Sequence, residues 1–425
     1  MGSFSFLHAA DLHLDSPFKG LRQSTPRLRE ELIRASFRAW DRLVQEAVER
    51  RVDFVLLSGD LTDHAGRSVR AHVRLSQGFR RLQEHGIAVY AVRGNHDPED
   101  GEWSGVEWPD NVHFFPSREV TRHTALTRAG RLPVHVYGIS YPERTVTDNL
   151  AKLFPKPEAG VYNIAVLHAN VDGREGHEPY SPCSKEELIG KGYDYWALGH
   201  IHVPQVLHER PYVVYSGNLL GRHMKEQGER GCYYIEVDDA GESKLEFISL
   251  ADIQFIRIDV DISDVEEPVE LHDRLLAALD ERIDASGSAS FIYRIRFIGS
   301  GKLHSYLQDA EQIGEWLSDL SESYTSIHSD RSGSVWMESW EDATLPDIDL
   351  SVLEQDNPFI QQLLQLEARF DDSLTEVWME ELLQPVMSNR KTARYVPAQH
   401  AEDQRKLLEQ AKLLAVRLLT EREEM

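Results

Sequence analysis

The sequence predicts a layered α/β fold in which two mixed β-sheets pack on each other and are flanked by helices. In residues 1–250, short apolar runs alternate with amphipathic stretches whose apolar residues recur at helical spacing. Apolar runs that alternate with helices in this way indicate a sheet covered by helices. The later runs follow one another with little helix between them, so we expect a second, more antiparallel sheet packed on the first.

The strands of this first part are expected at short apolar runs, and helices separate the early ones. The expected helices cover residues 28–51 and 69–86. The expected strands cover residues 4–9, 52–58, 87–93, 134–140, 162–168, 193–199, 212–216, 232–237 and 244–250.

The pattern changes near residue 251 and predicts a small α+β domain, followed by a helical region. Strands are expected at 255–263, 290–299, 324–330 and 334–342, with helices at 269–283 and 303–323. The helical region includes an apolar stripe of leucines and alanines at 401–423, which packs either on its own domain or on a partner helix. The expected domains are 1–250, 251–345 and 346–425.

The charge of the chain is uneven and limits its partners. The 425 residues carry a net charge of -25, of which -5 falls in residues 1–250 and -20 in residues 251–425. Such a chain repels nucleic acid at long range, which argues against non-specific coating of DNA but allows an enzyme with metals and local arginines. Cys183 and Cys232 offer no disulfide framework, and no apolar run reaches membrane-spanning length. We expect a cytoplasmic protein that does not associate with a membrane.

Residues of metal-ligand type follow five of the expected strands. They are Asp11 and His13 after the first strand, Asp60 after the second, Asn95, His96 and Asp97 after the third, His168 at the end of 162–168, and His200 and His202 after 193–199. An α/β sheet gathers its site at the carboxyl ends of its strands. Five such groups in succession are not explained as a set of core histidines, so the sequence predicts one shared metal centre.

The types of ligand indicate which metals this centre would hold. Aspartate, asparagine and histidine without cysteine favour Mn²⁺, Fe or Mg²⁺ over a structural zinc. Seven ligands are too many for one ion and suit two, with Asp60 as the natural shared carboxylate. A water between two cations becomes a hydroxide nucleophile near neutral pH, and the pair clamps a phosphate ester for in-line attack. The centre therefore suits the hydrolysis of phosphoesters.

The order of these motifs resembles a known superfamily. D-x-H, G-D-x-x-D, G-N-H-D, a lone histidine and G-H-x-H resemble the calcineurin-like metallophosphoesterases. Within that superfamily, HAADLHLDSPFKGL, DFVLLSGDLTD and VYAVRGNHDP are similar to the bacterial SbcD-type DNA repair exonucleases, particularly the YhaO-like branch. The motifs cover residues 8–202 and the loop at 216–218. The resemblance implies a metallophosphoesterase core and a capping domain at 251–345.

The resemblance also implies a role for each motif residue. It implies two ligand sets that share one carboxylate: Asp11, His13, Asp60 and His202 for one metal, and Asp60, Asn95, His168 and His200 for the other. His96 would then stabilise the phosphorane charge or protonate the leaving oxygen. Asp97 would either orient that imidazole and raise its pKa or form the turn before Pro98.

Cationic side chains near the expected centre are candidates for substrate binding. Arg67, Arg70 and Arg74 are spaced to share one helix face, which either meets a nucleic-acid backbone or is a solvated helix surface. The loop that follows G-H-x-H adds Arg222 and Lys225.

Three functions compete for this sequence. The first is a DNA exonuclease of DNA repair, and the second is a hydrolase of a smaller phosphodiester, such as a cyclic nucleotide, or of a phosphomonoester. The third is a scaffold without activity, which the intact ligand set argues against because unpaired buried carboxylates are costly. The resemblance favours the nuclease and implies DNA as substrate, Mn²⁺ as the favoured metal, a homodimer, and an SbcC/SMC-like coiled-coil ATPase bound by the C-terminal helix at about 398–423.

Overall fold

The chain divides into two compact units. The computed structural model describes residues 3–16, 26–63, 68–100, 107–128, 134–173, 178–286, 290–327 and 335–347, with residues 361, 362 and 415. One unit comprises Met1–Ile258, Ala278–Ile295 and Glu315–Glu341, and the other comprises Asp259–Ala277, Arg296–Gly314 and Asp342–Met425. The boundary therefore runs through the α+β domain expected at 251–345. The helices expected at 346–425 lie almost entirely outside the described residues.

The first six-stranded sheet is built around parallel strands that follow one another in the chain. Its strand order is β12-β11-β1-β2-β3-β4, in which β11 pairs antiparallel with both of its neighbours and β1 to β4 pair in parallel. The strands are β1 (Phe4–Ala9), β2 (Phe54–Ser58), β3 (Ala88–Val92), β4 (Val112–Phe114), β11 (Gly231–Val237) and β12 (Ser243–Ser249). The parallel pairing places the carboxyl ends of β1, β2 and β3 at one edge of the sheet.

The second six-stranded sheet also has a parallel centre. Its order is β5-β6-β7-β8-β10-β9, and the edge strands β5 and β9 are antiparallel to their neighbours. The strands are β5 (Thr121–Ala125), β6 (Val134–Gly138), β7 (Tyr162–His168), β8 (Tyr195–Gly199), β9 (Gln205–Glu209) and β10 (Tyr212–Tyr215). The two packed mixed sheets expected from the sequence are confirmed. The expectation that the second sheet is more antiparallel is wrong, because the late strands β11 and β12 join the first sheet and each sheet has three parallel and two antiparallel strand pairs.

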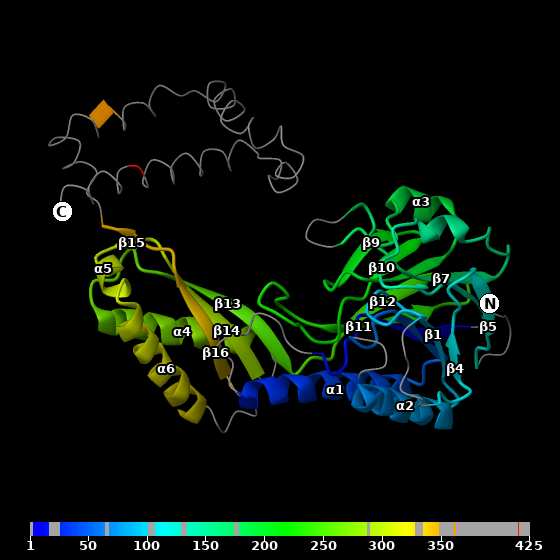
Figure 1. The fold of residues 1–425 in the computed structure, drawn as a ribbon, viewed down its shortest axis with the longest axis horizontal. Helices are drawn as coiled ribbons and strands as arrows, with labels where there is room; N and C mark the ends of the chain where they lie inside the picture. The colour runs from blue at the N-terminus through cyan, green and yellow to red at the C-terminus, as the bar shows by residue number, and fades with distance from the viewer. Residues whose placement is uncertain are drawn as a thin grey trace. The chain divides into compact units, whose positions relative to one another are not determined.

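Strand residues alternate between two cores, which explains the layers of this fold. Between the sheets, the Phe6 ring stacks on Phe54 with centroids 5.0 Å apart and meets Tyr195 edge-on at 5.3 Å. The alternate residues Leu7 and Leu57 belong to the core that also contains buried side chains of α1 (Pro26–Glu49) and α2 (Val69–Glu84). Helices α1 and α2 cover the sheet that contains β1, while α3 (Lys185–Gly190) lies at the opposite side, by the second sheet (Figure 1). A short 3-10 helix, η1 (Leu150–Leu153), completes this side.

The remaining strands form a three-stranded sheet with the order β13-β14-β16 and a two-stranded sheet of β15 and β17, and three helices accompany them. They are β13 (Ile253–Asp261), α4 (Pro268–Ser286), β14 (Ser290–Ile298), β15 (Ser300–Gly301), α5 (His304–Leu307), α6 (Ala310–Ile327), β16 (Val335–Asp342) and β17 (Leu345–Pro346). The strand expected from Tyr324 onward is wrong up to Ile327, because α6 continues through these residues. Tyr324 is buried at helical spacing from Leu317 and Leu320, so one apolar face extends the helix. None of the helices among the described residues is long and apolar enough to cross a membrane.

Candidate metal centre

The two sheets bring the expected ligands together from five loops. Asp11 and His13 follow β1, Asp60 follows β2, and the Asn95 to Asp97 segment follows β3. His168 ends β7 of the second sheet, and His200 and His202 follow β8. All of these residues except His96 and His202 are buried. Three groups of their ligand atoms lie within 4.8 Å of one another: Asp11, His13 and His202; Asp11, Asp60 and His168; and His13, Asp60 and His96.

The distances between these atoms suit divalent cations. Two ligands that bind one cation at about 2.1 Å and at a right angle lie about 3 Å apart. His13 Nε2 lies 3.1 Å from His202 Nε2, and His168 Nε2 lies 3.0 Å from the Asn95 side-chain oxygen. Asp60 lies between these pairs, since its Oδ2 is 3.4 Å from His168 Nε2 and 3.8 Å from His13 Nε2.

Each of the four histidines has its other ring nitrogen in contact with an acceptor. The Nδ1 atom of His13 donates to Asp63 at 2.5 Å, and that of His202 donates to Glu226 at 2.7 Å. His168 Nδ1 donates to the carbonyl of Ser58 at 2.9 Å, and His200 Nε2 donates to the carbonyl of Glu178 at 3.0 Å. Partners of this kind fix the tautomer and orientation of metal-bound histidines. The residues present therefore fit a bound metal.

The backbone at the centre is strained, which also indicates a functional site. Four expected ligands have positive φ angles although they are not glycine: Asp11 (51°), His13 (44°), Asp60 (52°) and His200 (95°). Such conformations cost on the order of 1–3 kcal/mol each and persist where the surroundings enforce them. Backbone hydrogen bonds from Asp11 to Gly59 and from His13 to Asp60, both 3.0 Å, hold two of these turns.

The glycine before Asp60 is required by the close packing of these loops. Gly59 has a φ of 93°, and a Cβ atom at this position would lie 2.6 Å from His168 Nδ1. Because β2 and β7 belong to different sheets, this glycine allows the two sheets to approach each other at the centre.

The carboxylates at the centre have shifted pKa values because they are buried together. Burial raises the pKa of Asp11 to about 6, although the imidazoles of His168 and His202 oppose this shift. Burial favours neutral Asp60, but the imidazoles of His168, His96 and His13 together outweigh it and keep the pKa of Asp60 well below its usual value. Burial lowers the pKa of His13 to about 3, so this imidazole stays neutral, as a metal ligand must.

Comparison with known proteins gives a family that accounts for this centre. A relative, the metallophosphoesterase YhaO of Bacillus subtilis (strain 168), is 33% identical over 418 residues, which are 98% of this chain and 98% of the relative. The family model for calcineurin-like phosphoesterases matches residues 4–204, and the model for the middle domain of metallophosphoesterase YhaO matches residues 255–345. The chain belongs to the calcineurin-like phosphoesterases. It is therefore a metal-dependent phosphoester hydrolase, and its aspartate and histidine clusters are suited to hold divalent metals.

A second relative matches part of the chain. The DNA double-strand break repair protein Mre11 of Methanopyrus kandleri is 28% identical over 265 residues, which cover 57% of this chain and 56% of that protein. Among solved structures, GAP50, the anchor in the inner membrane complex of Plasmodium, matches with a TM-score of 0.33 and 12% identity over 59% of this chain and 85% of that chain.

His96 of this phosphoesterase lies beside a different carboxylate from the one expected. His96 Nδ1 lies 3.0 Å from Asp63, and Asp63 and Asp60 raise its pKa although burial alone would lower it. The carboxylate of Asp97 instead accepts the backbone N–H groups of Gly94, Asp60 and Leu61 at 2.8–3.2 Å. Asp97 therefore ties the loop after β3 to the loop after β2, and the expectation that it orients His96 is corrected.

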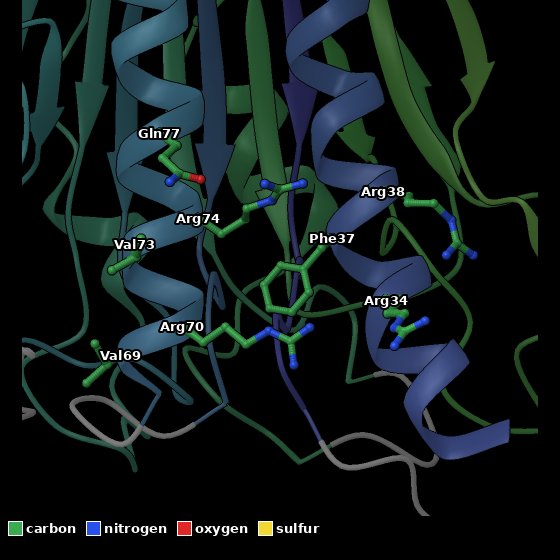
Figure 2. Close-up of a pocket in the computed structure, with 8 residues that line it drawn as sticks. All are labelled: Arg34, Phe37, Arg38, Val69, Arg70, Val73, Arg74 and Gln77. Atoms are coloured by element: carbon green, nitrogen blue, oxygen red, sulfur yellow. The ribbon is translucent and has the colours of Figure 1, made fainter. Parts of the chain in front are cut away.

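Two arginines of α2, Arg70 and Arg74, are engaged in contacts within the protein. Arg70 and Arg74 line a groove of about 710 Å³ between α1 and α2 (Figure 2). The Arg70 guanidinium lies 4.7 Å from the centre of the Phe37 ring, and Arg74 pairs with Asp41. Arg67 lies outside the described residues. Contact of these arginines with a nucleic acid therefore stays a prediction.

The loop after β10 supplies side chains that contact residues of the centre. Arg222 donates to Asp63 at 2.5 Å and also to Ser16, and only 13% of its side chain is exposed. Lys225 is exposed and therefore accessible to a substrate. The Glu226 carboxylate accepts from His202, from the Asn218 side chain at 2.8 Å and from the Arg222 backbone at 2.7 Å. Sequence reasoning missed Asp63 and Glu226 as supports, although Asp63 is the last residue of G-D-x-x-D.

Proposed function

We propose that this phosphoesterase is a two-metal nuclease that hydrolyses DNA phosphodiester bonds, with Mn²⁺ as the favoured cation. The observation that carries the proposal is that Asp60 lies between two ring nitrogens, those of His13 and His168, each of which could bind a separate cation. Two cations suit the in-line displacement of a phosphodiester. The relationship to Mre11, which is named as a DNA double-strand break repair protein, supports DNA as the substrate.

Two cations that share Asp60 would be held by two sets of ligands. One set would be Asp11, His13, Asp60 and His202, and the other Asp60, Asn95, His168 and His200, whose ring lies beside that of His168 with centroids 5.3 Å apart. Two divalent cations bound there would polarise the phosphate and acidify a bound water. The direction of the histidine rings is set by their acceptors, so little reorganisation is needed when substrate binds.

His96 supplies the proton for the leaving oxygen. Its backbone N–H donates to Asp60 at 2.8 Å, which places the residue beside the shared ligand. Its Nδ1 faces Asp63, so Nε2 is the nitrogen left to face the substrate. A proton moving from Nε2 to the departing oxygen lets the deoxyribose leave as an alcohol.

A direct test compares substrates and includes a matched inactive variant. The purified chain is incubated with Mn²⁺ and end-labelled single- and double-stranded DNA, with bis-p-nitrophenyl phosphate and p-nitrophenyl phosphate as the comparisons. We expect Mn²⁺-dependent cleavage of DNA and of the diester, and no cleavage by Asp60→Asn. Cleavage of the monoester alone, or of a cyclic nucleotide but not DNA, would replace this proposal with a small-molecule esterase.

Partners follow from the same proposal. The C-terminal helix expected at about 398–423 would bind an SbcC/SMC-like coiled-coil ATPase, and the chain would act as a homodimer. Deletion of residues 398–423 should abolish co-purification with the ATPase and leave hydrolysis of bis-p-nitrophenyl phosphate intact. Unchanged co-purification would refute this role, and a monomeric mass in light scattering would refute the homodimer.

A further inference from the structure

The metal centre is open to solvent at a few side chains. Most of the expected ligands are buried, whereas 21% of the His96 side chain and 18% of the His202 side chain are exposed. The side chain of Arg222, in the loop after β10, is 13% exposed and contacts the same centre. A phosphate that enters the centre therefore meets two imidazoles and one guanidinium cation. The cation attracts the anionic phosphate.

Arg222 is linked to each of the two exposed imidazoles through one carboxylate. Its Nη2 donates to Asp63 at 2.5 Å, and His96 Nδ1 lies 3.0 Å from the same carboxylate. Its backbone N–H donates to Glu226 at 2.7 Å, and Glu226 also accepts from His202 Nδ1 at 2.7 Å. These contacts hold Arg222 beside the opening of the centre.

Most hydrogen-bond donors of this guanidinium are not used within the protein. Nη2 donates to Asp63 and Ser16, whereas Nε and Nη1 have no partner in the part of the chain that the structure describes. Nε carries one N–H and Nη1 carries two, and this fork matches the oxygens of a phosphate. Because Nη2 is already held, little side-chain entropy is lost when the fork binds a ligand.

The other cations of the same loop are placed differently. Arg230 is only 2% exposed, and it donates to the carbonyls of His202 and Gln227 at 2.8 Å. Lys225 is exposed, but its ammonium group makes no contact with the centre among the described residues. Within the described loop, Arg222 is therefore the cation that combines a position at the centre with unused donors.

We infer that Arg222 binds a non-bridging oxygen of the phosphate that is hydrolysed, through its Nε and Nη1 donors. The cation stabilises the negative charge that grows on this oxygen when a nucleophile adds to phosphorus. The inference rests on the proposed function for the class of substrate, a phosphodiester, and not for the choice of DNA. The competing explanation is that Arg222 only holds Asp63 in place.

Ligands with a single phosphate distinguish these two roles. They are dithymidine monophosphate and the two diastereomers of its methylphosphonate, in each of which a methyl group replaces one non-bridging oxygen. Binding of fluorescently labelled ligands is measured by polarisation with Mn²⁺-loaded protein. All variants are made in a His96→Ala background, which prevents turnover and removes any effect that Arg222 exerts through the His96 imidazole.

The expected result depends on which oxygen is replaced. Arg222→Gln should weaken binding of the dinucleotide about 10–100-fold, as the loss of a hydrogen bond to a charged group does. It should also weaken one diastereomer, and it should leave unchanged the other, whose methyl group replaces the contacted oxygen. Equal weakening of both diastereomers, an unchanged affinity for the dinucleotide, or absence of dinucleotide binding would overturn the inference.

Two further variants complete the series. Arg210→Gln removes the same charge before β10, at the opposite end of the strand from Arg222, where the side chain is 84% exposed. It should leave the affinity for all three ligands unchanged. Arg222→Lys keeps the cation and replaces the glutamine variant if that variant does not fold. It should cause a smaller loss that again spares one diastereomer.

The outcome is separate from that of the nuclease proposal. If wild type cleaves no DNA but Arg222→Gln spares one diastereomer, the nuclease proposal fails and the phosphate contact stands. If wild type cleaves DNA but Arg222→Gln weakens both diastereomers equally, the nuclease proposal stands and the phosphate contact is wrong.

Discussion

Replacing Gly59 with alanine should damage the metal centre much more than the addition of one methyl group suggests. An alanine at the φ of 93° carries a backbone cost of about 1–3 kcal/mol. Its Cβ would lie 2.6 Å from His168 Nδ1, so the ring must move away from the Ser58 carbonyl, which loses a hydrogen bond of about 1 kcal/mol. We expect the free energy of unfolding to fall by about 2–4 kcal/mol. Mn²⁺ affinity should fall at least about tenfold, as when an imidazole loses its outer partner.

Gly86 provides the matched control for this substitution. It also has a positive φ, 69°, but a Cβ atom there would have no neighbour within 4 Å. Gly86→Ala should therefore cost only about 1–2 kcal/mol from the backbone and leave Mn²⁺ affinity unchanged. Urea unfolding of metal-free protein gives the free energies, and calorimetry gives the affinities. Wild-type Mn²⁺ affinity in Gly59→Ala, or equal effects of the two substitutions, would refute the argument that His168 is displaced.

Three further predictions concern the same centre. His96→Ala should retain its bound Mn²⁺, measured by elemental analysis, but lose about 10²–10⁴-fold in single-turnover cleavage of DNA, and retained turnover would remove His96 from the mechanism. Asp97→Ala leaves the backbone N–H groups of Gly94, Asp60 and Leu61 without their acceptor. The free energy of unfolding, measured in urea, should therefore fall by at least about 3 kcal/mol. A fall below about 1 kcal/mol would contradict the role of Asp97 in joining the two loops. Mn²⁺ at one hundred times its dissociation constant should raise the free energy of unfolding by about 2.7 kcal/mol, and a chelator should reverse this gain. An unchanged unfolding midpoint would show that no metal binds the folded state.

The candidate ligands could be predicted because each follows directly after a buried apolar run. Parallel strands bring their carboxyl ends to one edge, so the order of motifs alone places Asp11, Asp60 and Asn95 together. The supports of these ligands could not be found in this way. Asp63 meets His13 across 50 residues and Arg222 across 159, and no local pattern specifies which loop folds over the centre.

Two other expectations depended on local patterns, and the tertiary structure overrides one of them and adds contacts to the other. Tyr324 and Ile327 favour a strand by residue type, but the burial of Tyr324 beside Leu317 and Leu320 extends α6 instead. The arginine spacing on α2 correctly placed Arg70 and Arg74 on one face, since both line the same groove. The spacing could not reveal that Phe37 and Asp41 of α1 already contact them.

The division of the centre between two sheets has a consequence for the synthesis and folding of the protein. During synthesis the first sheet supplies its donors by residue 95, whereas His168, His200 and His202 emerge later, and the support from Glu226 later still. A nascent chain therefore carries four of its seven expected ligands before the other three have been synthesised. Hydrolysis should switch on only after the sandwich has closed, so that truncated or half-folded copies remain harmless.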